Sequence, residues 1–329
     1  MDVADFDYPL PEAAIAQTPV EPRHDARLLV AVGGTMAHRR VRDLPGLVGP
    51  GDVLVVNDSR VLPARLHLTK ATGGQAEVLL LEREGDSDTW TALVRPGRRL
   101  PAGTVLHAGE RPVVEVGAVV DDDGARRVRL LVADGELDRL GTVPLPPYVH
   151  AQLDDPERYQ TVYARRPVSV AAPTAGLHLT PEVIDACRVA GASVTTVELA
   201  VGLGTFKPMT SAQVEDHVMH GERYVVPPET MTACAEASRV IAIGTTVVRA
   251  LESAAAGENE GRTELFIHGE HRFRVVDVLL TNFHLPKSSL LVLLAAFCGS
   301  RWRALYDEAL AEGYRFLSFG DAMLIDRRP

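Results

Sequence analysis

The stretch Gly51-Asp-Val-Leu-Val-Val-Asn-Asp-Ser-Arg60 decides the fold class of this chain of 329 residues. Its apolar part, residues 53–56, is typical of a strand that is buried on both faces of a sheet. The strand ends in the polar group Asn57-Asp-Ser-Arg60. Ligands in open α/β sheets bind at the carboxyl ends of the strands. The stretch therefore predicts an α/β domain with a site at this end of the strand.

Apolar strands are also predicted in the second half of the chain, where they alternate with helical patterns. Alternation of this kind favours an α/β domain with a largely buried sheet. A short helix is also expected near the start of the chain, over residues 10–17. Further strands are predicted over residues 27–32, 194–201 and 240–244, and further helices over residues 181–190, 229–239, 247–255, 289–297 and 302–313.

Between residues 62 and 147 the pattern changes to short β-rich runs separated by turns such as Thr72-Gly-Gly74 and Asp121-Asp-Asp-Gly124. Regular short strands without helical periodicity indicate a small β-barrel. Because α/β texture lies on both sides of this segment, we expect a discontinuous α/β catalytic domain, residues 1–61 plus 148–329, interrupted by an inserted β-barrel domain, residues 62–147.

Composition restricts the class of protein further. An apolar content of 46% and a charged content of 24% are ordinary for a globular protein. The three cysteines lie far apart, which indicates neither a disulfide framework nor a zinc ribbon. The longest apolar run, residues 290–298, is too short to cross a membrane, and no signal peptide is recognisable. We expect a cytoplasmic protein without membrane association.

Two glycine-rich segments follow predicted strands, Gly202-Leu-Gly-Thr-Phe206 and Gly244-Thr-Thr246. The second joins a strand to a helix, whose start offers free N–H groups and the positive end of the helix dipole. Either segment could hold an anionic group, such as the carboxylate of a methionine moiety. Neither is a Walker loop or a GxGxxG sequence, so an ordinary tight turn remains an alternative.

Histidines supply most of the candidate chemistry. Asp216-His-Val-Met-His-Gly-Glu222 contains a His-x-x-His spacing, for which zinc binding, an acid–base site and structural hydrogen bonding are all open. His178 precedes a predicted helix that Thr180 caps, so it is either a neutral base or a histidine bonded to nearby backbone. The segment Thr281-Asn-Phe-His-Leu-Pro286 offers an amide and an imidazole in a predicted loop.

Read together, several long strings resemble the S-adenosylmethionine:tRNA ribosyltransferase-isomerase family over nearly the whole chain. The strings are FDYPLP (6–11), NDSRVLPAR (57–65), TGGQAEVLLL (72–81), AAPTAGLH (171–178), VGLGTF (201–206), HVMHGE (217–222), IGTT (243–246), TNFHLP (281–286) and SFGDAML (318–324).

The resemblance implies the same fold, an α/β domain with an inserted β-barrel. It also implies a reaction in queuosine biosynthesis. The ribosyl part of S-adenosylmethionine is moved onto 7-aminomethyl-7-deazaguanine at the wobble position of tRNA and rearranged, which yields epoxyqueuosine, adenine and methionine. The expected partners are tRNA and S-adenosylmethionine, the latter as a substrate. No metal and no further cofactor are expected, and we expect a monomer.

The resemblance also supplies candidate roles. The base and the acid are sought among His178, His220, Glu222 and His284. The residues expected to bind substrate are Asn57, Asp58, Arg60, Gly202, Gly204, Thr205, Phe206, Thr245, Thr246 and Asn282. The residues expected to bind tRNA through its phosphates are Arg95, Arg98, Arg99, Arg126, Arg127 and Arg129.

At Val168, Leu179 and Ala200 this sequence differs from residues that are common in the family. Three alternatives to the tRNA-modifying enzyme therefore stay open. The first is a relative that uses S-adenosylmethionine as ribosyl donor to a small-molecule amine. The second is a non-catalytic tRNA-binding relative. The third, a zinc hydrolase built on His217 and His220, is the least favoured because the HExxH pattern is absent.

Overall fold

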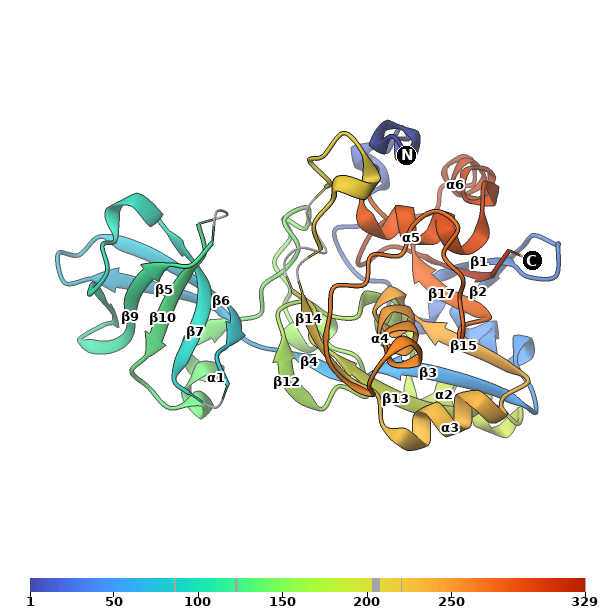
Figure 1. Ribbon diagram of the computed structural model, residues 1–329, viewed down its shortest axis with the longest axis horizontal. Coiled ribbons are helices and arrows are strands. Elements are labelled where there is room, and N and C mark those ends of the chain that lie inside the picture. Colours follow the sequence, from blue (N-terminus) through green and yellow to red (C-terminus); the bar gives the residue numbers. More distant parts are fainter. Residues whose placement is uncertain (86, 122–123, 203–207, 220, 329) are drawn as a thin grey trace. The chain divides into compact units, whose positions relative to one another are not determined.

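A computed structural model describes residues 1–85, 87–121, 124–202, 208–219 and 221–328 (Figure 1). Contacts between Cα atoms divide the chain into two units. The first unit comprises Met1–Arg60, Pro146–Arg166 and Ala172–Pro329, and the second comprises Val61–Leu145 and Pro167–Ala171. The expected domains placed residues 167–171 in the α/β part. In the structure β12 (Arg166–Ser169) pairs with β4 (Ser59–Val61), and the N–H of Leu62 donates to Ser169, which draws this segment to the second unit.

The first unit is built on a nine-stranded mixed sheet with the order β16-β14-β13-β3-β15-β17-β18-β1-β2. Its centre, from β13 to β17, is parallel, and every residue of β3 is buried. In this order the strands are Glu260–Thr263, Glu222–Val225, Ser193–Leu199, Asp52–Asn57, Arg239–Ile243, Val278–Asn282, Ala322–Asp326, Arg27–Ala31 and Ala37–Arg40. The buried stretch Asp52–Asn57 is therefore one of the two inner strands of the parallel centre.

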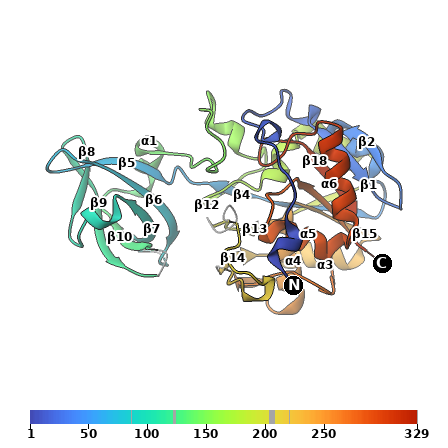
Figure 2. The ribbon, with the colours of Figure 1, turned by 90° about the horizontal axis from the view of Figure 1, so that it is seen from above.

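Helices cover both faces of this sheet (Figures 1 and 2). Side chains of α2 pack with Leu54 and Val56 in one core cluster. Thr230 of α3 bonds Thr195 of β13, which points to the opposite face because neighbouring side chains of a strand alternate. The helices of the unit are α2 (Pro181–Val189), α3 (Pro228–Glu236), α4 (Thr245–Ala256), α5 (Ser289–Cys298) and α6 (Arg301–Ala311).

Two expectations about local structure are wrong. Residues 10–17 do not form a helix, and only Glu12–Ala14 makes a 3-10 turn, because Ile15 pairs with Phe316 in an isolated β-bridge. Thr281 and Asn282 end strand β17 instead of lying in a loop. The antiparallel pair of β17 and β18 was not expected, whereas the five predicted helices of the second half begin and end within three residues of their expected limits.

The second unit is an antiparallel barrel, as the sequence predicted. Strands β5-β6-β7-β10-β9-β8 follow one another, and β5 closes the ring by pairing with β8. In this order they span Arg65–Lys70, Gln75–Arg83, Thr89–Arg95, Arg126–Leu130, Arg111–Val119 and Val105–Ala108. The short strand β11 (Gly141–Thr142) adds to β5 and follows α1 (Leu137–Leu140). In neither unit does the described chain contain a helix of the length and apolar character that a membrane span requires.

Candidate active site

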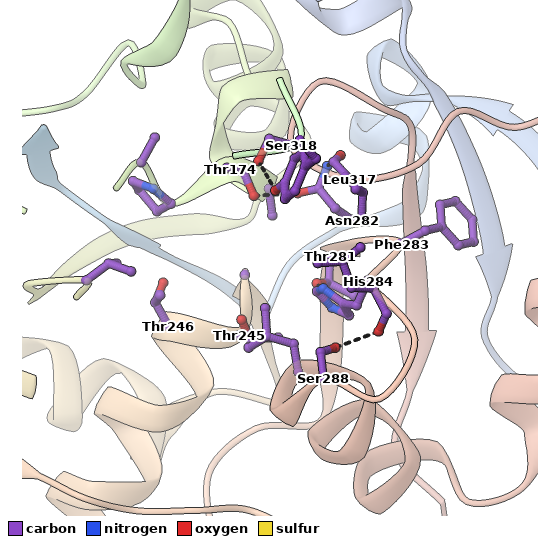
Figure 3. Close-up of a pocket in the computed structure, with 18 residues that line it drawn as sticks. Thr174, Thr245, Thr246, Thr281, Asn282, Phe283, His284, Ser288, Leu317 and Ser318 are labelled. Carbon is purple, nitrogen blue, oxygen red and sulfur yellow. Dashed lines mark hydrogen bonds between the residues drawn. The ribbon is translucent and has the colours of Figure 1, made fainter. Parts of the chain in front are cut away.

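A pocket of about 640 Å³, including its opening to solvent, lies in the α/β unit where β15 and β17 end (Figure 3). Two side chains with polar nitrogen atoms line it, Asn282 at the end of β17 and His284 two residues later. None of the described residues that line it is Asp, Glu, Lys or Arg. Most of its other polar groups are hydroxyls, which belong to Tyr148, Thr174, Thr245, Thr246, Thr281, Ser288 and Ser318. The wall is therefore polar but carries no permanent side-chain charge.

Local backbone chemistry explains why these residues meet. Gly244 follows β15 with φ 99°, a region that side chains rarely adopt, and this turn starts α4 directly at the pocket. After β17 the chain turns into α5, which Ser288 caps by accepting the N–H of Leu291 at 3.3 Å. Two helix N-termini therefore reach the same pocket.

His284 is the one expected catalytic residue, among those described, that lines this pocket. Its Nε2 lies 3.0 Å from Oγ1 of Thr281, and its backbone N–H donates to the hydroxyl of Tyr306 at 2.8 Å. Its carbonyl accepts a hydrogen bond from Tyr8. Burial lowers the pKa of His284 to about 3, because the protonated ring would lose hydration. The imidazole is consequently neutral at neutral pH.

His178 lies behind the wall of this pocket, in contact with Asn282. It lines a second, smaller cavity of about 250 Å³ together with Arg23 and Arg158. Burial lowers its pKa to about 4, with Arg315, Arg23 and Arg158 adding to the effect. Its Nε2 lies 3.0 Å from Nδ2 of Asn282. The two histidines are therefore separate, and the structure does not bring them into one site.

Glu222 lines neither of these two cavities. It is buried, its Oε2 forms an ion pair with Nη1 of Arg249 on α4, and its Oε1 accepts the N–H of Gly202 at 2.9 Å. Val201, just before this glycine, lines the pocket. Glu222 therefore fixes the start of the glycine-rich segment against α4. Of the other expected residues, His220, Gly204, Thr205 and Phe206 lie outside the described part of the chain.

The polar end of β3 holds strands together and does not line the pocket. The side chain of Asn57 accepts the N–H of Leu199 at 3.1 Å and donates to its carbonyl at 3.0 Å. It therefore joins β3 to β13 with the same pair of hydrogen bonds that a backbone partner would make. Arg60 forms an ion pair with Glu157. Asp58 lies 3.6 Å from Arg165, and burial raises the pKa of this carboxyl. The expected contacts of these three residues with substrate remain predictions.

Several lining residues were missed by sequence reasoning, notably Thr174, Ser288 and Ser318. Thr174 and Ser318 stand in strings that carry the family resemblance, AAPTAGLH and SFGDAML. Their place in these strings was the one signal in the sequence. A lone hydroxyl has no distinctive spacing, so the sequence alone does not single it out. Thr245, Thr246 and Asn282, which were expected to bind substrate, do line the pocket.

The barrel arginines fall into two groups. Arg126 is buried, and its guanidinium donates to the carbonyls of Gly97, Leu100 and Gly117, so it supports the barrel wall. The other described side chains of the set are exposed, and among them Arg95 lies 4.0 Å from Glu77, Arg127 2.8 Å from Glu84 and Arg129 2.5 Å from Glu115. The side chain of Arg98 lies outside the description.

Within the described ranges, no three or more His, Cys, Asp and Glu side chains gather so that they could hold a metal ion. His217 packs edge-on against Phe266, with ring centroids 5.2 Å apart. His220, the other residue of the His-x-x-His spacing, is not described.

Comparisons with known proteins cover nearly the full length of the chain. Residues 3–325 match the profile of a family described as queuosine biosynthesis protein. The chain is 48% identical to the S-adenosylmethionine:tRNA ribosyltransferase-isomerase of Moorella thermoacetica, with 99% of this chain and 100% of that protein aligned. It is 50% identical to the protein of the same name from Thermus thermophilus, over 97% of this chain and 98% of that protein.

A solved structure is similar as well. The crystal structure of S-adenosylmethionine tRNA ribosyltransferase from Thermotoga maritima matches with a TM-score of 0.56 and 36% sequence identity. The match covers 98% of this chain and 99% of that chain. Both units of the fold are therefore included in the likeness.

Proposed function

This chain belongs to the queuosine biosynthesis protein family, and from that premise we propose that it is an S-adenosylmethionine:tRNA ribosyltransferase-isomerase. It transfers and isomerises the ribosyl moiety of S-adenosylmethionine onto 7-aminomethyl-7-deazaguanine at the wobble position of tRNA. The products are epoxyqueuosine in tRNA, adenine and methionine. The observation that carries this proposal is identity near one half with proteins of that name, over nearly all of both chains.

The pocket supports the proposal because the reaction requires a base in an enclosed site. The positive sulfur of the donor acidifies the neighbouring 5′ carbon, so a positioned base can remove a proton from it and leave an ylide. His284 is the best placed base, since it lines the pocket and its ring is neutral, so that it can accept a proton. We assign its ring proton to Nε2, donated to Thr281, which leaves the lone pair of Nδ1 for the 5′ hydrogen.

The purine must also be held in place while adenine departs. Asn282 is our candidate for this positioning, because it lines the pocket and its amide is held in one orientation. Its Oδ1 accepts the hydroxyl of Thr174 at 2.9 Å, and its Nδ2 donates to the carbonyl of Leu317 at 3.2 Å. His178 then acts through Asn282 as a positioning residue.

For the acceptor, we propose that tRNA contacts the exposed arginines of the barrel, Arg95, Arg99, Arg127 and Arg129. Phosphate contacts of this kind fix the position of an RNA without reading its sequence. We further propose that the protein acts as a monomer in the cytoplasm and uses neither a metal nor a further cofactor.

The test is incubation with S-adenosylmethionine and tRNA that bears 7-aminomethyl-7-deazaguanine, followed by mass analysis of the nucleosides. Epoxyqueuosine is expected in the tRNA, with adenine released in equal amount. The free aminomethyl-deazaguanine base, offered in parallel, is the control for a small-molecule acceptor. Modification of the free base alone would assign the chain to that alternative. Binding of tRNA without any adenine release would assign it to a non-catalytic relative.

A further inference from the structure

The start of α4 differs from the starts of α2 and α5 in that no side chain caps it. Thr180 caps α2 and Ser288 caps α5, and each accepts an N–H of the first turn. At α4 the capping position is Gly244, which has no side chain. Across the described ranges, no acceptor is found for the N–H groups of Thr245 and Thr246, which line the pocket.

The hydroxyl of Thr245 adds a third donor at the same place. The residue is 7% exposed, and it lines the pocket at the first position of α4 (Figure 3). Within the described part of the chain, its hydroxyl has no hydrogen-bond partner, whereas Thr246 next to it accepts from Asn57 at 3.4 Å. The hydroxyl oxygen is not among the fully buried polar atoms that lack a partner, so it opens onto the pocket and can donate to a ligand there.

An anionic oxygen group satisfies all three donors at once. The N-terminus of a helix of 12 residues adds its positive dipole end, and no described carboxylate lines the pocket to oppose an anion. The backbone at Gly244 has a φ of 99°, which is strained for any residue with a side chain. A glycine is therefore favoured there, and its lack of a side chain lets a ligand approach the backbone.

We propose that the α4 N-terminus, formed by Gly244, Thr245 and Thr246, binds the carboxylate of the methionine part of the sulfonium donor. The proposal rests on the proposed function. A phosphate of the acceptor RNA has the same chemistry, but it carries a sugar on each side. The carboxylate is terminal, so it can reach Thr245, a residue that is only 7% exposed, without a second chain segment having to pass the residue. Binding the amino-acid end here leaves the 5′ carbon of the donor toward His284, on the other side of the pocket.

The test compares two ligands that differ only in this carboxylate, S-adenosylmethionine and its decarboxylated form. KM for S-adenosylmethionine and the inhibition constant of the decarboxylated compound are measured at saturating tRNA. Thr245→Val removes the hydroxyl and keeps the shape. It is expected to raise KM roughly tenfold or more, the usual worth of a hydrogen bond to a charged group, and to leave the inhibition constant within about twofold. Thr245→Ser keeps a hydroxyl and should restore the preference for the carboxylate.

Thr232→Val is the matched control, because Thr232 is exposed on α3 and its hydroxyl donates only to its own helix, to Pro228 at 3.1 Å. An equal rise of both constants in Thr245→Val overturns the carboxylate site. A rise of KM for tRNA alone also overturns it and would assign the anion to the RNA. Equal binding of S-adenosylmethionine and its decarboxylated form by the unchanged protein overturns it as well. Failure of the proposed function looks different, since the unchanged protein would then release no adenine with either ligand.

Discussion

Nδ2 of Asn282 lies 3.0 Å from Nε2 of His178, and this contact connects the wall of the pocket with the smaller cavity behind it. The amide also faces the carbonyls of Leu317 and Asp321, at 3.2 and 3.4 Å, so Nδ2 is the donor in this arrangement. His178 must then accept at Nε2 and carry its proton at Nδ1. The ring therefore helps to hold the amide of Asn282 in one orientation in the wall of the pocket.

Replacing His178 tests this positioning role. In His178→Ala the amide of Asn282 loses one of its acceptors, and turnover should fall roughly tenfold to a hundredfold while KM for S-adenosylmethionine changes little. His178→Gln offers a side-chain oxygen in place of Nε2 and should recover part of the loss. Adenine release is the measurement. Equal losses in both variants, with lowered melting temperatures, would mean that His178 serves stability alone.

The two buried histidines predict how stability depends on pH. Each has an ordinary pKa of 6.5 in the unfolded chain, against about 4 for His178 and about 3 for His284 in the folded protein. The unfolded chain therefore binds more protons as the pH falls below 6.5, and the free energy of unfolding decreases through this window. The part due to His178 is of the order of 3 kcal/mol.

Urea unfolding between pH 7 and pH 4 measures this dependence. His178→Gln removes one of the two groups, so its free energy of unfolding should fall less steeply with decreasing pH than that of the unchanged protein. His38→Gln is the control, since His38 is partly exposed. Parallel curves for His178→Gln and the unchanged protein would contradict the assigned burial effect.

The buried pair of Glu222 and Arg249 predicts a stability change that is not additive. Both side chains are at most 7% exposed, so removing either partner leaves an unpaired buried charge. Glu222→Leu and Arg249→Met should each lower the free energy of unfolding by about 3–5 kcal/mol, and the double variant by much less than their sum. The measurement is the free energy of unfolding in urea of the unchanged protein, the two single variants and the double variant, which together form a double-mutant cycle. Additive losses would show that the two charges do not depend on each other.

The exposed arginines of the barrel predict a charge-dependent affinity for tRNA. Arg127→Glu should weaken binding and lower the slope of log affinity against log salt by about one unit. Arg188→Glu is the control, because Arg188 on α2 is exposed to a similar extent and is likewise paired with a carboxylate. Filter binding at several salt concentrations is the measurement. Equal effects of both changes would indicate a general charge effect instead of an RNA face on the barrel.

Much of the architecture could be predicted from the sequence because its signals are local. The apolar run of β3, the Thr180 cap of α2 and the turn-rich spacing of the barrel strands each depend on a few neighbouring residues. The antiparallel pairing of β17 with β18 joins segments about forty residues apart, and neither strand has a distinctive pattern.

Four of the residues expected from the sequence line the pocket, namely Thr245, Thr246, Asn282 and His284, but their arrangement could not be predicted. His178 and His284 were both expected to be catalytic, yet only side-chain contacts place one behind the other's pocket. Glu222 is a glutamate and was therefore expected to be an acid or a base. Its ion pair with Arg249 joins residues that are distant in the sequence, so no local pattern indicates it. The burial and the contacts of these side chains follow from tertiary packing, which local sequence patterns do not reveal.

The central claim is that the sulfonium reacts in the pocket beside His284, with this imidazole as the base. Exchange of the 5′ hydrogens of S-adenosylmethionine into deuterated water, measured by mass spectrometry in the presence of tRNA, tests it most directly. The unchanged protein should exchange them. His284→Gln should lower both exchange and adenine release by roughly a hundredfold or more, with KM for the donor nearly unchanged. Exchange at the normal rate in His284→Gln would contradict the claim and move the base elsewhere.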